Sequence, residues 1–211
     1  MAPIAPIDAV QVVGARHVAA QRAIDVAALR GVPVFRASSA DARRALLELP
    51  AIRDARVELF LPGSARVALV EREAAGRWVV GTVEWFVDAD GILFPSVDPT
   101  AAPALRVMDE RTPARTAGER IAPQLVAAAL RLAKIAPGEL RADAVRPAVR
   151  ATAGADGLVL ASGAGWEIRF GTPERIDEKL ELVRRFLREQ PDRRLEYVDV
   201  RSPDRIVFSP R

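Results

Sequence analysis

Hydrophobic and polar residues alternate most regularly between residues 55 and 69. Residues 55–61 place Ala, Val, Leu and Leu at every second position, with charged or aromatic residues between them. After Pro62 and Gly63, residues 65–69 alternate in the same way. A period of two is typical of strands that bury one face. We therefore predict two strands joined by a Pro-Gly turn.

Two segments with helical periodicity precede these strands. In residues 16–31, apolar side chains recur at near-helical spacing, which predicts a first helix. Val18, Ala20, Ile24 and Ala28 lie near this spacing, and Gly31 is a plausible end of the helix. In the second segment, Ser38 precedes Asp41 by three residues, which is typical of a capped helix start, and Pro50 ends the helix. With a short strand before Gly14, residues 7–72 are predicted to run strand, helix, helix, strand, strand.

A second unit begins near Gly76. Apolar runs flank Asp-Ala-Asp-Gly at residues 88–91 and predict a hairpin, because Asp-Gly supplies the positive φ angles of a tight turn. Residues 96–120 are rich in proline and weakly periodic, which predicts a surface loop. A helix within residues 121–138 and several short strands within residues 145–171 are predicted to follow.

The C-terminal forty residues combine the strongest helix pattern with an extended end. Thr172 is predicted to cap this helix and Pro173 to occupy its first turn. The last stretch, LEYVDVRSPDRIVFSPR, carries two apolar runs around residues 202–204. It predicts either a hairpin or one bent strand. An exposed strand edge is normally something that a fold covers, so the end of the chain raises the question of what covers it.

Composition and charge narrow the function. Half of the 211 residues are hydrophobic, and 31 basic residues face 28 acidic ones. Lys134 and Lys179 are the only lysines, so the basic character comes from arginines that are interleaved with Asp and Glu. Nucleic-acid binding needs a basic patch or stripe, and the sequence shows none. We therefore predict no nucleic-acid partner.

Few residues could carry catalytic chemistry. The chain has no cysteine, which excludes disulfides and thiol catalysis, and His17 is its only histidine. We predict a solvated or helix-capping His17, and a surface charge cluster at Glu71 and Glu73. The Asp-Ala-Asp-Gly segment lacks the ligands of a calcium loop. No catalytic constellation emerges from these residues. We predict no metal and no cofactor, and a core role for Trp78, Trp85 and Trp166.

Membrane segments are not evident in the sequence. The longest uncharged runs span about ten residues, fewer than the roughly 20 that a membrane-spanning helix needs. The first ten residues lack the basic and long apolar regions of a signal peptide. Two alternatives stay open at this point: a cytosolic protein, or a sequence that begins after a removed membrane anchor.

The order of motifs resembles the FtsQ/DivIB family of cell-division proteins. The motifs are VQVVG at 10–14, GVPVF at 31–35, RRALLELPAIRDARVELFLPGSARVALVEREA at 43–74, VDADGILFP at 87–95, FGTPERIDEKLELVRRFL at 170–187 and YVDVRSPDRIVFSP at 197–210. Each motif alone is weak, and their order and spacing make the combination fairly specific. The resemblance covers nearly the whole chain apart from the proline-rich stretch.

The resemblance implies an α+β fold with two domains. Residues 1–74 would form a POTRA domain of β-α-α-β-β order, and residues 75–211 a mixed α/β domain, the β domain, with a C-terminal edge strand. Family members carry one transmembrane helix before the POTRA domain. We therefore expect the full-length protein to be a single-pass protein of the inner (plasma) membrane, with this sequence as its extracytoplasmic part at the division septum.

The resemblance also implies a non-enzymatic divisome scaffold. Its partners would be the bitopic FtsB (DivIC)-type and FtsL-type proteins, together with other divisome membrane proteins. The partner-binding residues are expected on the last two strands: Tyr197, Val198, Asp199, Val200, Arg201, Arg205, Ile206, Val207 and Phe208. Such an edge binds by adding a partner strand to the sheet. Which of the two strands is free, and which side chains touch the partner, stays open.

Three other interpretations remain. The last strands could merely complete the sheet, with Arg201, Asp204 and Arg205 protecting the edge from aggregation. A POTRA-type chaperone could bind unfolded barrel or secreted clients through the same strand addition. A hydrolase with two carboxylates would need a pocket that holds two acidic residues with perturbed protonation.

Overall fold

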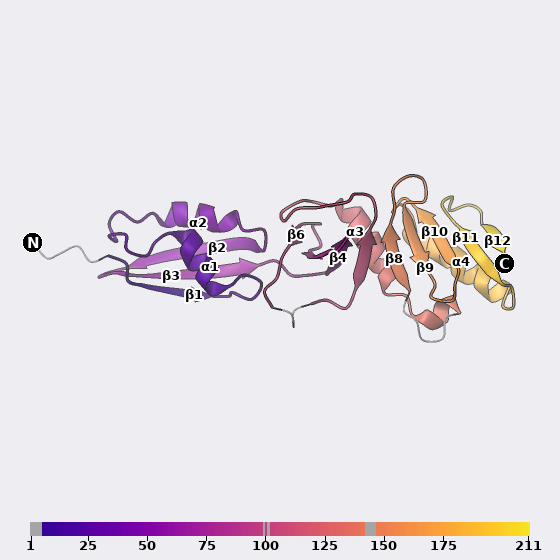
Figure 1. The fold of residues 1–211 in the computed structure, drawn as a ribbon, viewed down its shortest axis with the longest axis horizontal. Coiled ribbons are helices and arrows are strands. Elements are labelled where there is room, and N and C mark those ends of the chain that lie inside the picture. The colour runs from indigo at the N-terminus through magenta and orange to yellow at the C-terminus, as the bar shows by residue number, and fades with distance from the viewer. Residues whose placement is uncertain (1–5, 99, 101, 142–146) are drawn as a thin grey trace, which may run out of the picture.

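Two sheets lie one after the other along the long axis of the molecule (Figure 1). The computed structural model describes residues 6–98, 100, 102–141 and 147–211. The first five residues of the predicted POTRA domain and residues 145 and 146 of the predicted strand region lie outside these ranges. Helices and strands occur in separate runs along the chain and not in regular alternation, which confirms the α+β fold class.

The N-terminal sheet has three strands in the order β1-β3-β2. Its elements along the chain are β1 (Ala9–Val13), α1 (Ala20–Ala27), α2 (Ser39–Leu47), β2 (Ile52–Phe60) and β3 (Ser64–Glu71). β1 runs parallel to β3, and β2 runs antiparallel to it. The predicted order of strand, helix, helix, strand and strand is confirmed. Ala65, Val67 and Leu69 of β3 are buried, as their alternation with Arg66 predicts.

The two helices of this unit differ in how well the sequence predicts them. The hydroxyl of Ser38 accepts a hydrogen bond from the backbone N–H of Asp41 at 3.1 Å, which confirms the predicted cap of α2. In α1, by contrast, the buried residues are Ala23 and Ala27. The helix is therefore shorter than the periodic segment predicts: α1 begins at Ala20 and ends at Ala27, so Val18 and Ala28 lie outside it.

The C-terminal sheet has nine strands in the order β12-β11-β10-β9-β8-β7-β4-β5-β6. Its elements are β4 (Gly76–Val80), β5 (Val83–Val87), β6 (Leu93–Phe94), β7 (Arg106–Asp109), α3 (Pro123–Ala133), the 3₁₀ helix η2 (Pro137–Leu140), β8 (Ala148–Ala151), β9 (Leu158–Ala161), β10 (Glu167–Gly171), α4 (Ile176–Glu189), β11 (Leu195–Asp199) and β12 (Val207–Pro210). Side chains of α3 and α4 form one hydrophobic core with this sheet. Trp78 and Trp166 are buried in it, and Trp85 is half-buried against it.

Three predictions for this unit need correction. The apolar run before Asp88 contains an additional turn, so that β4 and β5 form a hairpin around Gly81. Residues 96–120 are not only a loop, because β7 lies within them and pairs in parallel with both β4 and β8. Four residues are too few to show a period, so only the neighbouring strands reveal β7. Finally, α4 begins at Ile176, and Thr172 does not cap it.

A small third cluster lies where the two units meet. It contains Ala51 of the first unit and Phe86 and Phe94 of the second. The ring of His17 packs edge-on against both phenylalanines, with centroid distances of 5.6 and 5.3 Å, and its Nδ1 lies 2.9 Å from the hydroxyl of Ser96. His17 is thus buried. The prediction of a solvated or helix-capping side chain is wrong, because both units contribute walls around it.

The backbone beside His17 is held by Glu71. The carboxylate of Glu71 accepts hydrogen bonds from the backbone N–H groups of Arg16, His17 and Val18 at 3.0, 2.6 and 3.0 Å. The predicted surface charge cluster is therefore wrong for Glu71, which fixes the turn before α1. Glu73 is exposed.

Further contacts connect the two units. The guanidinium of Arg72 donates to the carboxylate of Asp88 at 2.7 Å and to the carbonyl of Pro50 at 2.8 Å. The N–H of Val97 donates to the carbonyl of His17 at 3.0 Å. We call the contacts of His17, Glu71, Arg72 and Phe94 the joint. They tie the end of the first sheet to the start of the second.

Candidate functional site

The C-terminal strands form a hairpin, and its second strand is the edge of the large sheet. β11 pairs with β12 antiparallel, with Val198 opposite Phe208 and Asp199 opposite Val207. β11 also pairs in parallel with β10, to which α4 connects it. The strand order ends at β12. Of the two strands whose roles the sequence left open, β12 is therefore the free edge.

Two of the nine predicted binding residues lie inside the core. The side chains of Val198 and Val200 are fully buried and belong to the cluster that α4 covers. The N–H of Val200 also donates to the carbonyl of Arg169 at 3.0 Å. While the fold is intact, these two valines hold β11 in place and are not available to touch a partner.

Tyr197 and the charged pair next to it are engaged within the molecule. The guanidinium of Arg169 lies 4.3 Å from the ring centre of Tyr197. Arg201 donates to the carboxylate of Asp199 at 2.6 Å and reaches Asp156 at 3.3 Å. Although burial raises the pKa of Asp199, hydrogen bonds from Arg201 bring it below the ordinary value. Asp199 thus stays ionised and holds the turn between the two strands.

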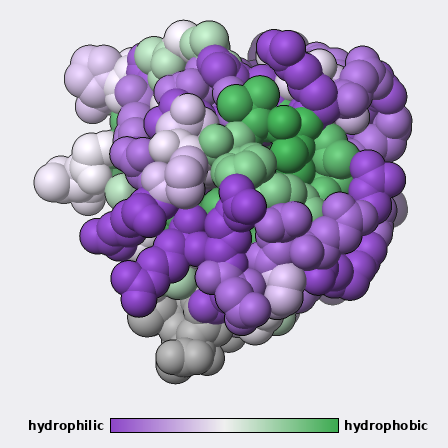
Figure 2. All heavy atoms as spheres, turned by 90° about the vertical axis from the view of Figure 1, so that its right-hand side faces the viewer, coloured by the Kyte–Doolittle hydropathy of each residue, from purple (hydrophilic) through white to green (hydrophobic). Residues whose placement is uncertain are grey.

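The apolar residues of the edge strand differ in exposure. Phe208 is half-buried, because its ring lies 5.1 Å from that of Phe186 in α4 and 4.8 Å from the guanidinium of Arg193. Ile206 packs against the same core. Val207 is 44% exposed. Figure 2 shows this end of the molecule, where a hydrophobic patch is surrounded by hydrophilic residues.

Two arginines flank the edge strand on either side. Arg205 precedes β12 and Arg211 follows it, and both are exposed. Neither forms an ion pair with any residue in the described part of the chain. Asp204, the turn residue before Arg205, lies 3.6 Å from Arg175 instead. The edge therefore offers apolar side chains between two positive charges that remain available to a partner.

Sequence reasoning missed the residues that support this edge. Phe186 and Arg193 hold Phe208, and Arg169 holds Tyr197. Phe186 follows Val183 by three positions, so helical spacing could have identified it as part of the buried stripe of α4. The stacked arginines carry no sequence signal, because the contacts cross between elements.

Three acidic residues away from the edge strand have lowered pKa values. Within the described ranges, no group of three or more His, Asp or Glu side chains could hold a metal ion. Burial raises the pKa of Asp109, but hydrogen bonds from Arg111 and Trp78 bring it down to about 2. The pKa of Glu119 and that of Glu139 are also lowered, by hydrogen bonds to Thr116 and to the Ala136 backbone. These carboxylates are charged hydrogen-bond partners and not proton donors near neutral pH.

None of the helices described here has the length and apolar character that crossing a membrane requires.

Comparisons with known proteins match two successive parts of the chain. A model of the FtsQ-type POTRA domain matches residues 5–72, and one of the cell division protein FtsQ/DivIB C-terminal region matches residues 76–201. The second match ends at Arg201, so β12 lies beyond it.

Two curated relatives carry the name cell division protein FtsQ, from Chloroflexus aurantiacus and Chloroflexus aggregans. Each is 29% identical to this chain over 178 residues, which are 84% of this chain and 64% of the relative. The chain thus spans somewhat less than two thirds of the length of these relatives. Because the C-terminal match alone covers more than half of the sequence, the chain belongs to the FtsQ/DivIB family of cell-division proteins.

Proposed function

We propose that this chain is a non-enzymatic scaffold of the divisome, which binds an extended segment of an FtsB (DivIC)-type or FtsL-type partner at β12. The observation that supports this most is the position of β12 as the free edge of the large sheet. Strand addition at such an edge draws affinity from backbone hydrogen bonds and specificity from alternate side chains. Phe186 and Arg193 hold the edge strand from behind, so a partner meets a preformed template.

The surroundings of β12 define the partner segment. Val207 presents apolar surface, and Arg205 and Arg211 lie on either side of it. A complementary segment would be short and extended, with an apolar side chain at its centre and acidic residues near both ends. Pro210 lacks a backbone N–H, which limits the pairing to a few residues. Specific contacts from side chains would therefore have to supplement the backbone bonds.

The proposal also covers the domain boundary and the position of the chain at the membrane. The boundary would lie between Ala74 and Ala75, after β3 and before β4. An anchor upstream of the described residues would hold the POTRA domain at the inner membrane, at the division septum. Other divisome membrane proteins would contact the same scaffold.

The test is calorimetric titration of this chain with the extracytoplasmic coiled coil of FtsB and FtsL from the same organism. Val207→Glu places a negative charge beside the edge and should weaken binding by about tenfold or more. Val83→Glu is the matched control, because Val83 is an equally exposed valine of the same sheet, 48% against 44%, and lies on β5. It should leave the affinity within about twofold of the unmodified chain.

Equal affinity of both variants and the unmodified chain would show that β12 is not the binding edge. The alternative chaperone function predicts a different outcome. In that case unfolded peptides from β-barrel proteins would bind this chain, and Val207→Glu would weaken their binding. The coiled coil would not bind.

A further inference from the structure

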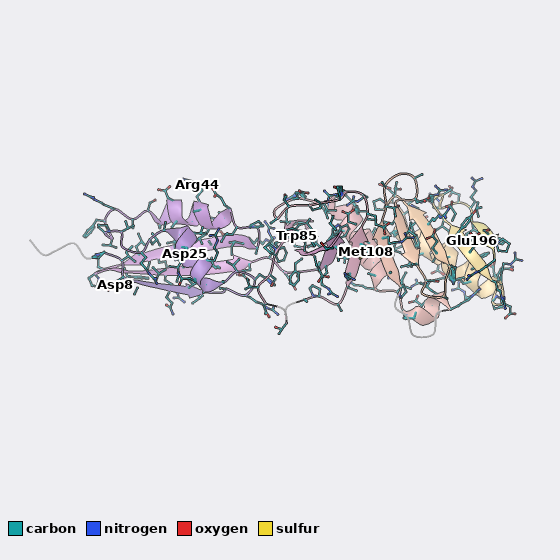
Figure 3. The ribbon with its side chains drawn as sticks, viewed as in Figure 1. Asp8, Asp25, Arg44, Trp85, Met108 and Glu196 are labelled. Atoms are coloured by element: carbon teal, nitrogen blue, oxygen red, sulfur yellow. The ribbon has the colours of Figure 1, made fainter. Side chains whose placement is uncertain are left out.

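The end of the molecule opposite β12 is a tip built from three chain segments. The N–H of Ile7 donates to the carbonyl of Val32 at 2.9 Å, and the N–H of Asp8 donates to the carbonyl of Gly63 at 3.1 Å. These bonds bring the start of the described chain between the loop before α2 and the β2–β3 turn. Figure 3 labels Asp8 at this end and Glu196 at the other. The N-terminal chain thus enters at the tip.

The tip exposes large apolar side chains. Phe35 is 73% exposed and Leu61 is 68% exposed, the two highest values among large hydrophobic residues in the described ranges. Phe60, next to Leu61, is 47% exposed. Phe35 comes from the loop, Phe60 is the last residue of β2, and Leu61 begins the β2–β3 turn. Exposed apolar residues that gather at one place mark an interaction surface. This end is therefore a candidate for a second interaction surface, separate from β12.

Charge at the tip favours an anionic partner. Arg30 and Arg36 lie on either side of Phe35 in the chain, and both are exposed. Neither forms an ion pair with the residues that the structure describes. Of the acidic residues near this end, Asp41 pairs with Arg44 at 2.8 Å, and Asp8 bonds through its backbone to the β2–β3 turn. The tip therefore combines protruding apolar side chains with two free positive charges.

We propose that Phe35, Phe60 and Leu61 enter the headgroup boundary of an anionic bilayer, while Arg30 and Arg36 contact the lipid phosphates. Aromatic and aliphatic side chains with neighbouring arginines are the composition of interfacial membrane contacts. The exposed side chains come from two separate chain segments at this end of the molecule, an arrangement that a deformable lipid surface accommodates without a matching pocket. The inference rests on the proposed upstream anchor, which would place this end toward the membrane.

The experiment places a fluorescent probe at the tip. The chain has no cysteine, so Leu61→Cys gives a single site for an environment-sensitive NBD label. The labelled chain is tethered by an N-terminal His tag to vesicles of phosphatidylethanolamine, phosphatidylglycerol and a nickel-chelating lipid. We expect a blue shift and a severalfold gain in NBD emission at residue 61. Replacing phosphatidylglycerol with phosphatidylcholine should reduce both, because the arginines lose their anionic partners.

Two labelled controls separate insertion from mere proximity. Ala40→Cys lies in the first turn of α2, close to the tip, and Val207→Cys lies at the far end; both residues are exposed. Neither should change emission on the vesicles. The same emission from residue 61 on vesicles and in buffer would overturn the proposal. A change at residue 61 that needs the coiled-coil partner and no lipid would also overturn it.

The outcomes of the two proposals can be told apart. A Phe35→Ser, Phe60→Ser variant that carries the Leu61 label should lose the lipid signal and keep its affinity for the coiled coil. Val207→Glu in the Leu61-labelled chain should lose that affinity and keep the lipid signal. If the coiled coil fails to bind any variant while the lipid signal persists, only the function proposed for β12 falls.

Discussion

The two edges of the large sheet end in opposite ways. At β6, the N–H of Leu93 donates to the carbonyl of Glu119 at 2.9 Å, and its carbonyl accepts from the N–H of Gly118 at 2.8 Å. Residues 118–121 thus cover this edge, and Phe94 packs in addition against His17. At β12, no described residue pairs with the outer side of the strand.

The difference shows that an open edge is not a general property of this sheet. The chain uses a segment after β7 to close one edge, and the first unit buries it further. Leu93 and Phe94 are fully buried there, whereas Val207 and Phe208 keep exposed surface. Proteins that expose an edge without a use for it protect it with charges, prolines or short strands. β12 is short and contains Pro210, yet its apolar side chains are supported from behind and left uncovered.

The largest effect is expected from breaking the closed edge at Gly91. Its φ is 82°, and a Cβ at this position would overlap the carbonyl of Ile121. Gly91→Ala should therefore lower the free energy of unfolding by at least about 3 kcal/mol. Gly154 is a matched control, because its φ is also 82° but nothing lies within 4 Å of the added carbon.

Urea denaturation measures both variants. Gly154→Ala should cost only about 1 kcal/mol, the strain of the backbone alone. If the two variants lose the same stability, contact with residues 118–121 does not hold the closed edge.

A smaller effect is expected at His17, which packs on the closed edge. His17→Ala removes the contacts with Phe86 and Phe94 and should cost about 2 kcal/mol. Burial lowers the pKa of His17 below its ordinary 6.5, while the nearby Glu71 opposes this shift. The folded protein therefore favours the neutral ring, and only the unfolded chain takes up a proton near pH 6.5. The contribution of His17 to the free energy of unfolding should be complete above that pH and should decline as the pH falls below it.

This pH dependence can be isolated, because His17 is the only histidine. Thermal unfolding between about pH 5.5 and about pH 7.5 should show a slope that His17→Ala removes. An unchanged slope in the variant would assign the dependence to another group and weaken the role of the joint at this edge.

The smallest effect on stability is expected at the open edge. Val207→Ser should change the free energy of unfolding by no more than about 0.5 kcal/mol, because the side chain is already partly in water. Hydrogen exchange provides the companion measurement. Backbone amides of β12 should exchange at least about tenfold faster than that of Leu93. Slow exchange in the isolated chain would mean that β12 is already covered, and the contrast between the edges would disappear.

The sequence predicts the first unit well where its periodicity is strong. Alternation in β2 and β3 and the Ser38 cap are local signals, and the structure bears them out. β7 escaped prediction because it has four residues and owes its position to parallel neighbours. His17 escaped because its surroundings come from residues about 70 to 80 positions away.

At the candidate site, too, local sequence patterns could not predict the arrangement of the strands. The sequence allowed either a hairpin or a bent strand at the C-terminus, and the pairing of β11 with β12 shows the hairpin. Which strand is free depends on the parallel pairing of β10 with β11, which forms only after α4 has crossed the sheet. The inward direction of Val198 and Val200 follows from that pairing. Such long-range geometry leaves no periodic signal in a strand of five residues.

The joint has a mechanical consequence. Arg72 and His17 fasten the end of the first sheet to the start of the second, and Glu71 holds the backbone of His17 in place. The molecule would therefore act as a spacer between its two ends. A partner on β12 would be carried at a set height above whatever surface the tip meets. Loosening the joint would then change the height and orientation of the bound partner while leaving the chemistry of either end intact.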